Sequence, residues 1–194
     1  MISCKVIFLD IDGVLATDDS DYIYFDKKCV EVLNSILEQV PAKIVVTSSW
    51  RLHFNLKGLR KMADRGGSYF LDENGDNKVS DEDDFYSSEE YFDLLKKADS
   101  PPYLDSSVII GKTECLRKNP GLSETESWGR GYEIEQWLEY AKDKINVESY
   151  LVLDDDSFDL ATHAHRMVVT DTPIGLVPSD VEKCLAILNT PIIN

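Results

Sequence analysis

Residues 4–19 read CKVIFLDIDGVLATDD, and they place two carboxylates directly after an apolar run. The run from Val6 to Leu9 is typical of a buried strand, yet Asp10 and Asp12 follow it at once. Like charges at the mouth of a hydrophobic strand are unfavourable unless a ligand offsets them. The stretch therefore predicts a strand that ends at a functional site.

Short apolar runs alternate with helix-like periods along the rest of the chain. Strands are predicted at 4–9, 43–47, 107–111, 149–159 and 166–171. Helices are predicted at 27–40 after the N-cap Asp26, at 48–67 with Ser48 or Ser49 as cap and Gly66 as stop, at 87–98, at 131–145, and from Ser179 onward. This alternation predicts an α/β fold, a parallel sheet with helices on both faces, whose functional crevice lies at the carboxyl ends of the strands.

The composition is that of a globular protein, with 43% hydrophobic residues in a chain of 194. A single domain is predicted over 1–194, with an insertion at about 66–106. No apolar run approaches membrane-spanning length, and the apolar N-terminus is too short for a signal peptide. The four Cys are scattered, as in proteins of a reducing compartment. We therefore expect a cytoplasmic protein, with secretion that needs no N-terminal signal as the alternative.

The formal net charge of −16 weighs against nucleic acid as the main partner, because polyanions are bound through Lys and Arg. The charge is uneven, since residues 72–84 hold seven acids and one Lys. Elsewhere acids and bases are closer to balance, which leaves room for a local basic groove.

Acids and hydroxyls stand at the predicted strand ends, in Asp10–Asp12, Thr47–Ser49 and Asp154–Asp156. If these strands are neighbours in the sheet, the three tips converge on one spot. So many carboxylates cannot all stay ionised without a cation. Mg²⁺ prefers carboxylate oxygens and water, so the tips predict a magnesium site.

Four motifs follow one another along the chain. They are FLDIDGVL (8–15), VVTSSWR (45–51), GRGYEIEQWL (129–138) and YLVLDDD (150–156). Together they resemble the haloacid dehalogenase-like (HAD) phosphohydrolases, and the phrasing TSSWR, RGYEIEQWL, LDDD is similar to a branch found in RNA-repair proteins. The resemblance spans 4–65 and 107–178. It implies a Rossmann-like HAD fold without a large cap.

The resemblance also implies roles for single residues. Asp10 would be the nucleophile that forms an aspartyl-phosphate, and Asp12 the general acid and base, with its backbone carbonyl on Mg²⁺. Thr47 would hydrogen-bond a phosphoryl oxygen. Arg130 would neutralise charge on the transferred group, although the superfamily commonly has Lys there and Lys112, Arg117 and Lys118 compete for the role.

The remaining implied residues complete the metal site and the substrate contacts. Asp154 and Asp155 would join Asp10 and Asp12 at the metal, with Asp155 as a direct ligand and Asp156 as an outlying acid. Ser48 and Arg51 are candidates for contact with the substrate, and a surface helix charge is the alternative for Arg51.

Two other features favour plainer interpretations. His163 and His165 have the spacing of a metal pair, but without a third ligand they are interpreted as polar residues near a helix surface. Trp137 is predicted to be a core residue.

The acidic segment DENGDNKVSDED, residues 72–83, has the spacing of an EF-hand calcium loop. The ligands would be Asp72, Asn74, Asp76, the Lys78 carbonyl, Ser80 and Asp83. Asn77 stands where the loop needs Gly, and Asp83 is shorter than the usual Glu. A solvated acidic loop is therefore the simpler interpretation, with Ca²⁺ binding as the alternative.

The sequence thus predicts a Mg²⁺-dependent phosphomonoester hydrolase that works through an aspartyl-phosphate. Open sites in the superfamily are similar to those that act on bulky substrates, so the expected substrate is a phosphoprotein, with phosphotyrosine as one candidate, or a small phosphomonoester. A nucleic-acid end (3′-) phosphatase is the first alternative, opposed by the net charge. A non-catalytic binding protein with the HAD fold is the second, opposed by the full set of acids.

Overall fold

The computed structural model describes residues 2–20, 24–66, 104–115 and 129–192. Within them lies a five-stranded sheet in the order β3-β2-β1-β4-β5, and every pair of neighbouring strands is parallel. The strands are β1 (Ile2–Leu9), β2 (Ala42–Val46), β3 (Ile109–Lys112), β4 (Ile145–Asp154) and β5 (Met167–Val169). The predicted α/β fold with a parallel sheet is confirmed.

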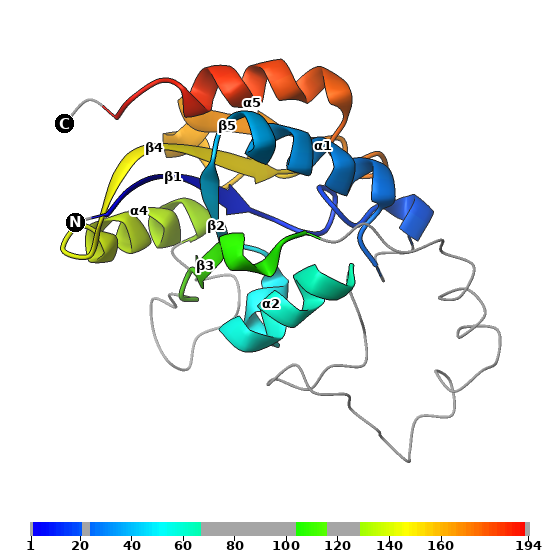
Figure 1. Cartoon of the computed structure of the whole chain (residues 1–194), viewed down its shortest axis with the longest axis horizontal. Helices are drawn as coiled ribbons and strands as arrows, with labels where there is room; N and C mark the ends of the chain where they lie inside the picture. Colours follow the sequence, from blue (N-terminus) through cyan, green and yellow to red (C-terminus); the bar gives the residue numbers. More distant parts are fainter. Residues whose placement is uncertain (1, 21–23, 67–103, 116–128, 193–194) are drawn as a thin grey trace, which may run out of the picture.

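Helices cover both faces of this sheet (Figure 1). The α-helices are α1 (Lys27–Gln39), α2 (Leu56–Arg65), α4 (Gly129–Ala141) and α5 (Val181–Leu188). Shorter 3₁₀ turns are η1 (Asp18–Ser20), η2 (Ser49–Leu52), η3 (Ser106–Val108), η5 (Ala161–Arg166) and η6 (Pro178–Asp180). Figure 1 shows α1 and α5 side by side over one face and α4 on the other. Among the described helices, none is long and apolar enough to cross a bilayer.

The sheet has a hydrophobic core on each face, and alternate side chains of β1 point into one core or the other. Ile7 and Leu9 belong to the core on the side of α1 and α5, whereas Val6 and Phe8 belong to the core under α4. Phe8 is fully buried, and its ring meets the partly buried Trp137 edge-on at 5.4 Å between centroids. Because the period is two residues, the position that follows Leu9 turns toward the α4 side again.

The hydrogen-bond register sets the strand ends level with one another. Leu9 is level with Val46 of β2 and with Leu153 of β4. The ladder continues one residue further, since the Asp10 N–H donates to the Leu153 carbonyl at 2.9 Å. The residues that follow these three strand positions therefore lie in one row across the sheet.

The helix predicted over 48–67 is two separate helices in the structure, η2 and α2. The Asn55 side chain caps α2 by accepting from the Gly58 N–H at 2.9 Å. This N-cap was not predicted, because Ser48 is an equally suitable cap earlier in the sequence. Gly66 ends α2 as predicted, in the left-handed conformation with φ of 76°.

Other element boundaries differ at the ends. The helix predicted at 131–145 begins earlier and ends at Ala141, because Ile145 already belongs to β4. The last helix is not capped by Ser179. Instead η6 precedes it, and the Asp180 carboxylate accepts from the Val177 N–H at 3.2 Å. The predicted helix at 87–98 lies outside the described residues.

A buried ion pair joins η2 to α4. The Arg51 guanidinium lies 2.5 Å from the Glu133 carboxylate, and the side chains are 7% and 3% exposed. Arg51 also donates to the carbonyls of Thr47 and Ser48. This side chain therefore ties the turn after β2 to the helix on the sheet face beneath it.

We expect Arg51→Met to destabilise the fold by about 3 kcal/mol, because it leaves a buried carboxylate with one cation fewer. Urea unfolding would measure the loss. The matched control is Lys142→Met in the exposed pair with Glu139, which we expect to cost less than about 1 kcal/mol. Equal losses for the two variants would contradict the importance of the buried pair.

Candidate active site

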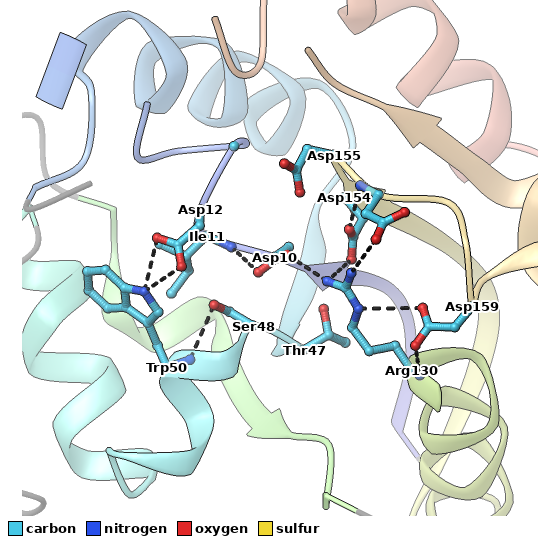
Figure 2. Close-up of polar contacts among 12 residues, drawn as sticks. Asp10, Ile11, Asp12, Thr47, Ser48, Trp50, Arg130, Asp154, Asp155 and Asp159 are labelled. Carbon is cyan, nitrogen blue, oxygen red and sulfur yellow. Dashed lines mark hydrogen bonds and ion pairs between the residues drawn. The ribbon is translucent and has the colours of Figure 1, made fainter. Parts of the chain in front are cut away.

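Three strand ends and one helix start converge at the carboxyl edge of the sheet (Figure 2). Asp10, Thr47 and Asp154 follow the level positions of β1, β2 and β4, and alternation turns them toward α4. Arg130, in the first turn of α4, places Nη1 2.6 Å from Asp10 Oδ2 and 2.7 Å from Asp154 Oδ2. The predicted meeting of these four residues is thus present in the structure.

Asp159, which the sequence analysis did not single out, holds Arg130 in place. Its Oδ2 accepts from the Arg130 backbone N–H at 2.8 Å, and its Oδ1 lies 3.6 Å from Arg130 Nε. An acid at a helix N-terminus is favourable because it meets free N–H groups and the positive end of the helix dipole. The only signal in the sequence was a further Asp shortly after the acidic strand tip.

The structure distinguishes Arg130 from Lys112, one of the other candidate cations. Lys112 Nζ donates to the carbonyls of Arg51 and Phe54, at 2.7 and 3.1 Å, away from Asp10. Arg117 and Lys118 lie outside the described residues. Among these candidates, Arg130 is the described residue that bonds to the carboxylates of Asp10 and Asp154.

Burial by itself would lower the pKa of Arg130, but the charges of Asp154, Asp10 and Asp159 outweigh it and raise that pKa. The guanidinium therefore stays charged between the carboxylates. A permanent cation at this point suits an anionic ligand.

Three carboxylates form a group that could hold a metal ion. Oxygens of Asp10, Asp154 and Asp155 all lie within 4.8 Å of one another, and the first two residues are buried. Thr172 Oγ1 orients the third by donating to Asp155 Oδ2 at 2.8 Å. An all-oxygen donor set with several negative charges fits a hard cation such as Mg²⁺.

Gly13 makes room for this group. Its φ is +70°, and a Cβ at this position would lie 2.3 Å from Asp155 Oδ2. Any side chain would displace the carboxylate. Thr170 Oγ1 fixes the same turn by donating to the Gly13 carbonyl at 2.7 Å.

The pKa values reflect carboxylates that are crowded and poorly solvated. Burial, then the charge of Asp10, raises the pKa of Asp154 to about 8, although Arg130 opposes this. Burial also raises the pKa of Asp10, against the lowering effects of Arg130, the Ile11 N–H and the Ser48 side chain. A divalent cation would relieve both, which supports the fit of the group to a metal.

Asp12 points away from the metal group and toward Trp50. The indole Nε1–H lies 3.0 and 2.9 Å from the two Asp12 carboxylate oxygens. The pKa of Asp12 is raised, mainly by burial and further by the charges of Asp10 and Asp155, while the hydrogen bond from Trp50 opposes the shift. A raised pKa suits a general acid near neutral pH. The metal role of Asp12, expected through its backbone carbonyl, stays a prediction.

Thr47 carries a buried hydroxyl without a partner. The residue is 1% exposed, and its Oγ1 makes no hydrogen bond to any residue that the structure describes. Figure 2 shows the side chain beside Asp10 and Arg130. An orphaned buried hydroxyl is unfavourable and therefore rare, so its position next to a cation indicates a ligand.

Ser48 and Arg51 are both buried. The Ser48 hydroxyl accepts from the Trp50 N–H at 3.3 Å, and Ser48 also contributes a hydrogen bond to Asp10. The interpretation of Arg51 as a surface charge is wrong, because its guanidinium faces Glu133 in the interior. Contact of either side chain with a substrate stays a prediction.

Both histidines were predicted to be polar residues near a helix surface. This prediction is wrong for His163, which is buried, and agrees with the exposure of His165. His163 is 3% exposed, and its Nδ1 and Nε2 lie 2.9 Å from the Tyr150 hydroxyl and the Gly131 carbonyl. The cause is the packing of η5 against α4, which the sequence pattern does not show. The acidic segment 72–83, interpreted as a solvated loop with Ca²⁺ binding as the alternative, lies outside the described residues.

Comparison with known proteins gives one match. The family described as "HAD domain in Swiss Army Knife RNA repair proteins" matches residues 6–181, a range that includes all four motifs. No curated protein and no solved structure matches the chain.

We expect the metal-free protein to lose stability as the pH rises. Unfolded Asp titrates near pH 4, whereas folded Asp154 holds its proton up to about pH 8, so unfolding in this window releases a proton. The free energy of unfolding therefore falls between about pH 4 and about pH 8, by a few kcal/mol. Mg²⁺ should stabilise the protein more at the upper end of this window.

Urea unfolding across this pH range, with EDTA and with Mg²⁺, measures the effect. Asp154→Asn should flatten the fall, and Asp143→Asn, at an exposed site, should not. A difference between wild type and Asp154→Asn that does not change with pH would contradict the expectation.

Proposed function

Because the chain belongs to the family of HAD domains in Swiss Army Knife RNA repair proteins, we propose that it is a Mg²⁺-dependent phosphomonoester hydrolase that works through an aspartyl-phosphate. One observation carries the proposal. The Arg130 guanidinium bonds to the buried Asp10 carboxylate, and the Thr47 side chain, whose hydroxyl has no partner among the described residues, lies beside them (Figure 2). These are a nucleophile and two ligands for phosphoryl oxygens.

Asp10, Asp154 and Asp155 would hold the metal ion, and the Asp12 carbonyl would join them. When bound, Mg²⁺ would offset the negative charge of the phosphoryl group and of the attacking carboxylate. Carboxylate oxygens favour Mg²⁺ over metals that prefer nitrogen or sulfur ligands. We propose no calcium site.

In the first step, a carboxylate oxygen of Asp10 attacks phosphorus, and the bond from phosphorus to the leaving oxygen breaks. Arg130 and the Thr47 hydroxyl bind the equatorial oxygens as negative charge shifts onto them. Asp12 gives its proton to the leaving oxygen, so the product is an alcohol or a phenol. The raised pKa of Asp12 keeps this proton available.

In the second step, water attacks the phosphorus of the aspartyl-phosphate. Asp12, now ionised, takes a proton from the water, and the bond from phosphorus to the Asp10 oxygen breaks. Inorganic phosphate leaves, and both carboxyl groups return to their starting states. One ester and one water thus give one alcohol and one phosphate.

Two substrate classes follow from different observations. The net charge of −16 favours a phosphoprotein or a small phosphomonoester over a polyanion. The description of the family favours the phosphorylated end of an RNA as the second candidate. We place the phosphoprotein or small ester first.

A substrate panel separates these classes. With Mg²⁺, we expect release of phosphate from a phosphotyrosine peptide to exceed release from a 3′-phosphorylated oligonucleotide, with Asp10→Asn as the blank. Preference for the oligonucleotide would reverse the order of the two substrates. No hydrolysis of any phosphomonoester would favour a binding protein and contradict the proposal.

Thr47→Val should separate catalysis from stability. Within the described part of the chain the hydroxyl has no partner, so we expect unchanged stability or a gain of up to about 1 kcal/mol. The rate should fall about 100-fold, because a donor to the phosphoryl group is lost.

The matched variant is Thr170→Val, another buried Thr at a strand end, whose hydroxyl donates to the Gly13 carbonyl. It should lose about 1 kcal/mol of unfolding free energy. Urea unfolding and phosphate release measure the two effects. A Thr47→Val variant that is less stable but fully active would refute the assigned role.

A further inference from the structure

Trp50 makes one polar contact that the mechanism above does not explain. Its indole Nε1–H lies within 3.0 Å of both carboxylate oxygens of Asp12. In Figure 2, Asp12 and Trp50 lie on one side of Asp10, and Arg130 and Asp154 lie on the other. The contact therefore lies on the side of Asp10 where Asp12 would protonate the leaving group.

The indole is fixed on its other sides by aromatic packing. Its ring lies 6.5 Å from the ring of Phe25 and 6.4 Å from that of Phe54, centroid to centroid. Its backbone N–H donates to the Ser48 hydroxyl at 3.3 Å, at the start of η2. A ring held in this way directs its N–H to one point, and the hydrogen bond to Asp12 costs little further side-chain conformational entropy.

The chemistry of indole gives the contact a direction. Indole N–H is a donor only, so it cannot accept the proton that Asp12 carries as an acid. A protonated Asp12 must turn its unprotonated oxygen to Trp50 and its O–H elsewhere. When Asp12 has given the proton away, the same N–H donates to the carboxylate. One donor therefore orients Asp12 in both of its states.

We infer that Trp50 is a positioning residue, which holds the Asp12 carboxyl so that its proton is directed to the leaving oxygen. The inference rests on the proposed phosphatase function. Trp50 touches neither the phosphoryl group nor Asp10 in this role. Its effect should therefore depend on how strongly the leaving group needs a proton.

Two aryl phosphates with leaving groups of different basicity test this dependence. Phenyl phosphate would release a strongly basic phenoxide that needs a proton from Asp12, whereas 2,4-dinitrophenyl phosphate releases a weakly basic phenoxide that does not. Trp50→Phe keeps an aromatic ring and removes the donor together with the five-membered ring that carries it. We expect kcat/KM, which reports the step in which the leaving group departs, to fall about 10- to 100-fold with phenyl phosphate and less than about threefold with the dinitrophenyl ester.

Phe54→Leu is the matched control, because it disturbs the stacking of Trp50 and keeps the N–H. It should change the two rates by the same small factor. Equal losses for both esters in Trp50→Phe would show a purely structural role, and no loss for either would show an idle contact. Both results overturn the inference and leave the proposed function intact.

Failure of the proposed function gives a different pattern. In that case wild type with Mg²⁺ hydrolyses neither ester faster than Asp10→Asn does, and the positioning role is overturned with it. If Trp50→Phe does not fold, NMR of the indole N–H groups tests the contact. Asp12→Ala should then speed the hydrogen exchange of one indole signal at least tenfold; unchanged exchange of every indole signal overturns the inference.

Discussion

The register of β1 between β2 and β4 is the constraint on which the site depends. Leu9 is level with Val46 and Leu153, so the next residue of each strand falls in the same row. Neighbouring strands lie about 4.8 Å apart, which brings Asp10 close to both Thr47 and Asp154. A slip of one residue would turn a whole strand over and send its tip to the other face. The apolar residues that fix the register therefore also fix the chemistry.

The same alignment creates an electrostatic problem. Asp10 and Asp154 are buried beside each other, and one guanidinium, from Arg130, bonds to both. With Asp155, three carboxyl groups face one cation, and they cannot all ionise without further positive charge. Folded proteins are stable by only about 5–15 kcal/mol, and an uncompensated buried charge costs several of these. One divalent cation would offset the excess negative charge. The three carboxyl groups that destabilise the metal-free protein are therefore the groups that would bind the metal ion.

The sequence predicted what depends on local pattern and failed where distant segments meet. The strands and their acidic tips were predictable because burial and alternation leave a direct trace. The break at Asn55 was missed because Ser48 offered an equally good cap earlier. Asp159 was missed and His163 was wrongly placed at the surface because their partners lie on α4, and only the packing of residues 159–163 against that helix brings them together.

The turn that follows β2 links the two arms of the site. Its residue Trp50 bonds to Asp12 on the leaving-group side, and Arg51, next in the chain, pairs with Glu133 on α4. That helix also carries Arg130, one turn earlier. Because residues of η2 bond to both Asp12 and α4, a shift of η2 would disturb the acid and the cation together. The motif TSSWR thus contains more than the proposed phosphoryl ligand and a helix cap, because its last two residues couple Asp12, the proposed acid, to the helix that carries Arg130.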